Sequence, residues 1–214
     1  MMRQNLTFFF TAMALLLSGN LAAAKQPEFL DLEGVKLEMT ADQVRAAMQA
    51  KGNPIAREEK DDRLKYKSSF QDLVSVKRED PKRFKGYTLT SELRYETERG
   101  NLRVKFMPFV DRLVVVSARL YSNDAPSMSP SIPDCAKFMD KMGERYDLDI
   151  NTDASRGLSR YSSKQKPMKV NGEMKEDGQM LLFRCGPRIM PQVLLHNPHA
   201  RDMLMQQIDQ ALSD

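Results

Sequence analysis

The sequence LRVKFMPFVDRLVVVSARLY, which spans residues 102–121, holds the clearest structural pattern in this chain of 214 residues. Val104 and Phe106 stand two positions apart in its first part, and Leu113 and Val115 do so in its second. Because successive side chains of a strand point to opposite faces, this spacing predicts two β-strands that each bury one face. The stretch therefore predicts neighbouring strands of an antiparallel sheet.

Further strand candidates on either side extend this pattern. Glu98-Arg99-Gly100-Asn101 has the composition of a hairpin connection, with a glycine between polar residues. We expect an antiparallel meander with strands at Arg63–Phe70, Tyr87–Glu96, Leu102–Phe109 and Leu113–Tyr121.

A short helix is predicted before this sheet. Thr40 is placed to cap it, Gln43 follows three residues later and completes a capping box, and Gly52 ends it. Its narrow apolar stripe includes Val44 and Met48, while the intervening residues are polar. We expect this stripe to pack on the sheet.

Residues 123–133 contain three prolines among small polar residues, a composition that sustains neither a helix nor a central strand. We therefore expect a linker at 123–133, between a first unit at 25–122 and a second unit at 134–214. The second unit repeats the order of the first: we predict a helix from about Pro133 to Tyr146 and strands near Leu158–Ser162, Gln179–Cys185 and Gln192–His196.

The chain closes with a predicted helix. Asn197 would cap it, Pro198 would occupy its first helical position, and its apolar face, which includes Leu204 and Ile208, would pack on the second sheet. The expected fold class is α+β, with two tandem units, each a short helix packed on an antiparallel sheet, plus a C-terminal helix.

Residues 1–24 have the pattern of a cleavable secretory signal. Arg3 precedes the apolar run Leu6–Leu17, and small residues end the segment at Ala24. The apolar run is shorter than the ~20 residues of a membrane-spanning helix, and no later segment is longer. No cysteine follows Ala24 that could carry a lipid anchor. We expect a mature protein that begins at Lys25, is not integral to the membrane, and is periplasmic or secreted.

The two cysteines, Cys135 and Cys185, are expected to form a disulfide, as pairs in exported proteins usually do. Cys135 lies on the apolar face of the predicted helix at 133–146. Alternation places Cys185 on the same side of its strand as Leu181 and Phe183, which is the apolar side. Both thiols should therefore point into a core.

Two segments are strongly basic and are expected to be loops. The first could bind an acidic protein, an anionic lipid or an acidic glycan, and the second would add to its potential if both lay on one surface. Whether they share a surface remains open at this stage. The residues predicted to bind a partner are Lys77, Arg78, Lys82, Arg83, Phe84 and Lys85 in the first segment and Arg156, Arg160, Lys164 and Lys166 in the second.

The sequence contains no motif typical of an enzyme. There is no nucleophile elbow, phosphate-binding glycine loop or zinc-protease motif, so we predict no catalytic residues and no cofactor. The formal net charge of +4 is too small to imply nucleic acid. His196, His199 and Met203 are weak candidates for a soft-metal site, although methionine more often fills cores.

Residues 32–44, LEGVKLEMTADQV, resemble the segment that opens domains of the beta-lactamase-inhibitor-protein-like group, which includes small outer-membrane-assembly lipoproteins. The resemblance is carried by Gly34, Val35, Met39, Thr40 and the residues up to Val44, with Glu38 where the family commonly has glycine. It implies an exported, non-enzymatic domain that binds another protein on a concave sheet.

The function predicted from these observations is that of an exported protein-binding module, such as an inhibitor, an immunity protein or an accessory of envelope assembly. One alternative is a binder of anionic lipid or cell-wall glycan through the basic segments. A second alternative is a soft-metal-binding periplasmic protein. The sequence leaves the oligomeric state open.

Overall fold

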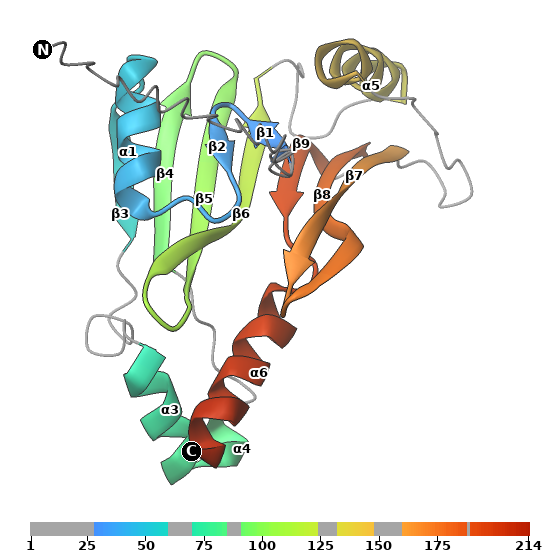
Figure 1. Cartoon of the computed structure of the whole chain (residues 1–214). Coiled ribbons are helices and arrows are strands. Elements are labelled where there is room, and N and C mark those ends of the chain that lie inside the picture. Colours follow the sequence, from blue (N-terminus) through green and yellow to red (C-terminus); the bar gives the residue numbers. More distant parts are fainter. Residues whose placement is uncertain (1–27, 60–69, 85–90, 124–131, 148–159, 188) are drawn as a thin grey trace, which may run out of the picture.

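The computed structural model describes residues 28–59, 70–84, 91–123, 132–147, 160–187 and 189–214, and it has the predicted α+β class. Seven antiparallel strands form one sheet (Figure 1). From edge to edge they are β3 (Ile55–Glu59), β4 (Ser91–Thr97), β5 (Gly100–Pro108), β6 (Leu113–Ser122), β9 (Ile189–His196), β8 (Glu173–Gly186) and β7 (Arg160–Val170).

The remaining elements are helices and one small hairpin. The helices are α1 (Ala41–Ala50), α3 (Phe70–Glu79), α4 (Pro81–Phe84), α5 (Ile132–Tyr146) and α6 (Ala200–Ser213), and the hairpin pairs β1 (Asp31–Leu32) with β2 (Val35–Lys36). No helix in these described segments is long and apolar enough to cross a membrane.

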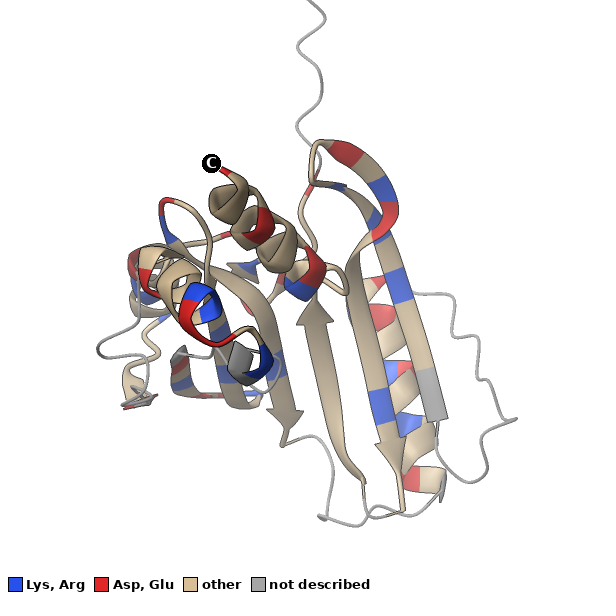
Figure 2. Cartoon of the chain, turned by 90° about the horizontal axis from the view of Figure 1, so that it is seen from below, with Lys and Arg blue, Asp and Glu red and all other residues tan. Residues whose placement is uncertain are grey.

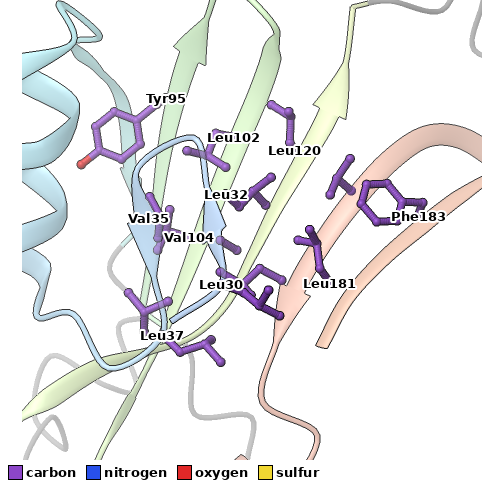
Figure 3. Close-up of a cluster of buried hydrophobic side chains, with 14 of the residues drawn as sticks. Leu30, Leu32, Val35, Leu37, Tyr95, Leu102, Val104, Leu120, Leu181 and Phe183 are labelled. Carbon is purple, nitrogen blue, oxygen red and sulfur yellow. The ribbon is translucent and has the colours of Figure 1, made fainter. Parts of the chain in front are cut away.

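The main core lies on one face of the sheet, which we call the inner face. Alternate residues of β4, β5, β6, β8 and β9 point into it, as in the buried pattern Leu102, Val104, Phe106 of β5. The β1–β2 hairpin lies over the middle strands and adds Leu32 and Val35 (Figure 3). Apolar side chains of α1 and α5 complete the cluster, so the inner face is covered from both ends.

The two predicted units share this sheet and this core. Pairing of β6 with β9, from Ser117 opposite His196 to Tyr121 opposite Gln192, joins the strands of one unit to those of the other. Helix α1 packs on the first group of strands, whereas α5 contacts β7 and β8. The strands of both predicted units form one continuous sheet, and α3 and α4 interrupt the first group between β3 and β4. Residues 124–131 of the predicted linker lie outside the described residues.

A second, smaller core joins α3 and α6. Phe70, Leu73 and Val74 of α3 pack with Leu204 and Ile208 of α6. The two helices lie side by side beyond one end of the strands (Figures 1 and 2). The prediction that the last helix packs on the second sheet is therefore wrong, because its apolar face is covered by α3.

Two helix boundaries also differ from the sequence-based expectation. Residues 63–69 of the strand predicted at Arg63–Phe70 lie outside the described residues, and Phe70 begins α3. At the other end of the chain, α6 starts at Ala200 instead of Pro198. Asn197 accepts a hydrogen bond at Oδ1 from the backbone N–H of His199 (2.8 Å), which forms a turn that delays the helix by two residues.

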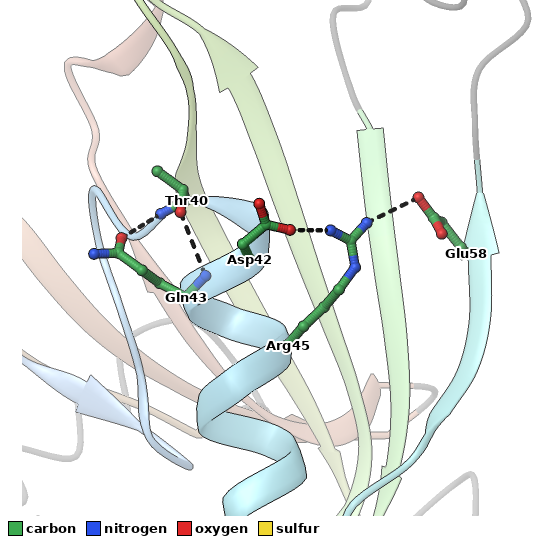
Figure 4. A network of polar contacts seen from close by, with 5 residues as sticks. All are labelled: Thr40, Asp42, Gln43, Arg45 and Glu58. Atoms are coloured by element: carbon green, nitrogen blue, oxygen red, sulfur yellow. Dashed lines mark hydrogen bonds and ion pairs between the residues drawn. The ribbon is translucent and has the colours of Figure 1, made fainter.

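The capping box predicted for α1 is confirmed. Thr40 Oγ1 accepts from the backbone N–H of Gln43 (3.3 Å), and Gln43 Oε1 accepts from the backbone N–H of Thr40 (2.8 Å). One turn further, Arg45 binds Asp42 (2.7 Å) and reaches Glu58 of β3 (3.1 Å), as Figure 4 shows. The cap fixes where the helix begins, and the arginine ties the helix to the edge of the sheet.

Polar contacts hold the β1–β2 hairpin in place. Glu33 and Gly34 form its two-residue turn with positive φ values of 57° and 89°, the conformation that tight hairpins require. Glu33 accepts a hydrogen bond from Arg99 Nη1 (2.9 Å) in the β4–β5 turn. Gln179 Oε1 accepts from the buried backbone N–H of Leu30 (2.9 Å). The hairpin is thereby attached to both halves of the sheet.

Cys135 of α5 and Cys185 of β8 are bonded, with a Cα–Cα distance of 5.4 Å, and both side chains are fully buried. The bond fastens α5 to the second half of the sheet beside Phe183, whose ring lies 5.5 Å from that of Tyr146. The predicted pairing and the predicted inward direction of both thiols agree with this geometry.

We expect the Cys135→Ala, Cys185→Ala double variant to lose about 4 kcal/mol of unfolding free energy, the chain-entropy value for a loop of this length. The bond closes a loop with a sequence separation of 50 residues. Urea denaturation of the oxidised wild type and the variant measures the difference. Reduced wild type is the control, and a variant as stable as the oxidised protein would contradict the structural role.

Thr40→Ala is expected to lower the free energy of unfolding by about 1 kcal/mol, because it leaves a backbone donor of α1 without its acceptor. Thr40→Ser retains the hydroxyl and should stay within a few tenths of a kcal/mol of the wild type. Chemical denaturation of the three proteins compares them. Equal losses in both variants would show that the methyl group, and not the cap, stabilises this position.

Candidate binding face

The sheet face opposite the main core, which we call the outer face, carries the polar half of the strand alternation. In β5 and β6 these positions are Arg103, Lys105, Ser117, Arg119 and Tyr121, all half-buried. Because the inner face is filled by apolar residues, the pleat itself directs the charges to the outer face.

Four arginines oppose one another across the outer face. The strand register pairs Arg57 of β3 with Arg94 of β4, Arg94 with Arg103 of β5, and Arg103 with Arg119 of β6. We call this row the arginine ladder; it covers three strand spacings, or roughly 14 Å. Like charges directly opposite each other destabilise a sheet. Arg94 is paired with Glu92 (2.6 Å), so the opposition that matters for the stability of the sheet is that of Arg103 and Arg119.

A cavity of about 290 Å³ lies beside Arg103 and Arg119, at the end of the ladder nearer the middle of the sheet. We call it the outer pocket. It reaches across four strands, from β4 to β9, so both halves of the chain contribute to it. Its lining consists of Glu92, Arg103, Lys105, Ser117, Arg119, Tyr121, Leu194 and His196.

Positive charge dominates the outer pocket. Three permanent cations line it, Arg103, Lys105 and Arg119, against the single carboxylate of Glu92. That carboxylate accepts a hydrogen bond from Arg94 Nε (2.6 Å) and lies 3.9 Å from Lys105 Nζ. The negative charge of Glu92 is thus paired with Arg94 and Lys105. The part of the pocket formed by Arg103 and Arg119 retains its positive charge.

Tyr121 organises these two arginines. The Arg103 guanidinium lies 4.8 Å from the centre of the Tyr121 ring, and that of Arg119 lies 5.9 Å from it. Arg119 Nη1 also donates to the Tyr121 hydroxyl (3.2 Å). Arg103 Nε is buried and has no hydrogen-bond partner among the described residues. Such a donor is costly unless a ligand or water satisfies it.

His196 closes the pocket on the β9 side. Burial, and next the positive charge of Arg119, hold the pKa of His196 below its ordinary value of 6.5. The imidazole is therefore neutral at neutral pH, where one ring nitrogen can accept a hydrogen bond and the other can donate one. It adds a polar wall without adding to the positive charge.

The first basic segment is helical and is not the predicted loop between strands. Lys77 and Arg78 end α3, and Lys82, Arg83 and Phe84 lie in α4, which begins at Pro81; Lys85 lies outside the described residues. Apolar residues at helical spacing pack α3 on α6, and this packing overrides the loop pattern. Lys77 pairs with Asp209 of α6, while Arg78 and Lys82 are exposed.

The second basic segment belongs to strand β7, at the other edge of the sheet. Arg156 lies outside the described residues, and Arg160 is the first residue of β7. Lys164 Nζ donates to the carbonyls of Tyr146 (3.0 Å) and Asp147 (3.1 Å) at the end of α5, and Lys166 pairs with Glu28 (2.7 Å). Lys164 and Lys166 thus make internal contacts, and the strand that carries them lies away from α3 and α4 (Figure 1).

The weak metal candidates lie in different surroundings. His196 lines the outer pocket, His199 Nε2 binds Asp177 Oδ1 (2.9 Å) at the start of α6, and Met203 Sδ accepts from Asn197 Nδ2 (3.3 Å). Within the described segments, no group of three or more His, Cys, Asp or Glu side chains is arranged to hold a metal ion.

The arginine ladder and the outer pocket were not anticipated from the sequence. The sequence does contain an indication of them, because Arg103, Lys105 and Arg119 stand at the polar positions of the two clearest strands. What the sequence did not provide is the register that places Arg103 beside Arg119 and brings β9 against β6.

Comparison with family models, curated proteins and solved structures found no match to this chain. The function is therefore argued from the geometry of the outer face.

We expect Arg119→Gln to raise the pKa of His196 part of the way to its ordinary value of 6.5, because one cause of its lowering is removed while burial remains. NMR titration of the imidazole measures it. Lys137→Gln, on the exposed side of α5, is the matched control.

A histidine that is neutral in the fold makes the protein lose stability as the pH falls below about 6.5, because the unfolded chain then binds a proton that the folded chain does not. His196→Gln should remove that part of the loss, and an unchanged pH profile would contradict this assignment.

Proposed function

We propose that this protein is an extracytoplasmic, non-enzymatic binding module that holds a protein partner on the outer face of its sheet. The arginine ladder is the observation that carries this proposal. Within this row, the like charges of Arg103 and Arg119 face each other and oppose sheet stability, and a partner with negative charge would reverse that cost on binding. Inhibition of an enzyme, immunity toward a toxin and accessory work in envelope assembly are all activities of this kind.

The composition of the outer face supports a protein partner. Arginine and tyrosine are enriched among the residues that contribute most to protein interfaces, where binding removes them fully from water. Arg103, Arg119 and Tyr121 are half-buried and hold one another in place. They stand on the central strands of a sheet backed by the main core, so they would lose little conformational entropy on binding.

Two further observations support export. The chain begins with a segment that has the pattern of a secretory signal, and its cysteines lie at bonding distance, as is usual in oxidising compartments. The resemblance of residues 32–44 to the beta-lactamase-inhibitor-protein-like group favours binding on a sheet. In this chain those residues build the β1–β2 hairpin and the cap of α1.

The basic segments favour a lipid or glycan surface less than the sequence indicated. Lys77, Lys164 and Lys166 have internal partners, namely Asp209, two backbone carbonyls and Glu28. The charges of Lys77 and Lys166 are compensated by carboxylates and add little to attraction for an anionic surface, whereas the two carbonyls fix the position of the Lys164 ammonium without neutralising it.

The test is a cross-linking pulldown from the native host's envelope with the full chain, expressed with its own leader and tagged at the C-terminus. We expect one dominant protein to be retained, and Arg119→Glu to reduce its binding by roughly tenfold or more, as for an interface anchor. Lys137→Glu, the same charge reversal on α5, should bind within about twofold of the wild type.

Thermal unfolding separates binding from folding. Arg119→Glu, the variant of the pulldown, should unfold at the same temperature as the wild type or slightly higher, since it relieves the opposition of Arg119 to Arg103. If the pulldown retains anionic lipid or cell-wall glycan and no protein, the proposed function is rejected in favour of the surface-binding alternative.

A further inference from the structure

We infer that the outer pocket is the receptor for a single acidic side chain, an aspartate or glutamate, of the partner protein. This inference rests on the proposed function and names the chemical group that the partner presents at the centre of the outer face. Its basis is the size of the pocket, its charge, its unsatisfied donor and its apolar wall.

The size of the pocket suits a side chain. Its volume of about 290 Å³ is at the lower limit of the roughly 300–1,000 Å³ typical of small-molecule sites. It is open to the outer face and lined from both sides by residues of adjacent strands. A side chain projecting from a partner that lies on the sheet would enter it directly.

The charge of the pocket suits one carboxylate. Arg103 and Arg119 are opposite each other in the register and converge on the Tyr121 ring. The planar guanidinium group matches a carboxylate with two parallel hydrogen bonds. Arg103 Nε is buried without a partner among the described residues, so it would gain an acceptor oxygen only when the guanidinium turns toward the bound carboxylate. The two opposed guanidinium groups supply the positive charge for one carboxylate.

The other walls favour a carboxylate on an aliphatic stem over a free phosphate. The Tyr121 ring and Leu194 give apolar surface on which the methylene groups of aspartate or glutamate can pack. Glu92 places a negative charge at the other side of the pocket, where it would repel a doubly charged phosphate more than a singly charged carboxylate. His196, on the β9 side of the pocket, offers a neutral polar group.

The pocket can be tested without the partner. The full processed chain is titrated by NMR with the blocked tripeptide Gly-Glu-Gly, with its neutral match Gly-Gln-Gly and with inorganic phosphate, while the Arg103 Nε–H and His196 ring signals are followed. We expect saturable shifts with the glutamate peptide, in the millimolar range, at least fivefold smaller shifts with the glutamine peptide, and weaker binding of phosphate. Equal shifts with both peptides, tighter binding of phosphate, or no shift would overturn the inference.

Variants link the response to the two arginines. Arg103→Lys keeps the charge but removes the planar fork and Nε, and Arg119→Gln removes the opposite charge; each should reduce the affinity for the glutamate peptide at least fivefold. Lys137→Gln should not change it. Near-UV circular dichroism checks that each variant is folded, and unchanged affinity in folded variants would overturn the inference.

The captured partner distinguishes the two proposals. If a partner binds through the outer face, as Arg119→Glu reports, and Arg103→Lys binds it as the wild type does, the pocket assignment is wrong and the proposed function stands. If the glutamate peptide binds as expected but the envelope yields no protein partner, the proposed function fails, and the carboxylate chemistry of the pocket is retained without it.

Discussion

The pairing of β6 with β9 is the contact on which the rest of the structure depends. It joins strands that are separated by about 70 residues of chain and makes one sheet from two groups of strands. The main core then runs without interruption beneath α1, the β1–β2 hairpin and α5. The outer pocket depends on the same pairing, because Arg119 comes from β6 and His196 from β9.

The alternation of the strands turns this pairing into a functional asymmetry. Every second residue of the central strands is committed to the inner face, where helices and the hairpin exclude water. The intervening residues must then lie on the outer face, and in β5 and β6 they are largely cationic. A rigid, core-backed sheet thus presents closely spaced arginines that a flexible loop would separate to relieve their repulsion.

The elements with local signals were predicted well, and those that rest on distant contacts were not. The capping box of α1, the strand pattern of 102–121 and the pairing of Cys135 with Cys185 are carried by neighbouring residues or by a pair without competitors. Helix α3 was missed because the residues that pack with its apolar face are distant in sequence: Met107 and Phe109, and α6 more than a hundred residues later. The site was missed for the same reason, since alternation gives the face of Arg103 but not its neighbours on other strands.

The positive charges of this protein differ in what the fold does with them. Lys77, Lys164 and Lys166, prominent in the sequence, form internal pairs that hold α3 to α6, β7 to α5 and β7 to the start of the described chain. Arg103 and Arg119 instead oppose each other, and Arg103 keeps a buried donor unsatisfied among the described residues. The opposed pair gives the outer pocket a positive potential, and this potential would stabilise an anionic group of a partner.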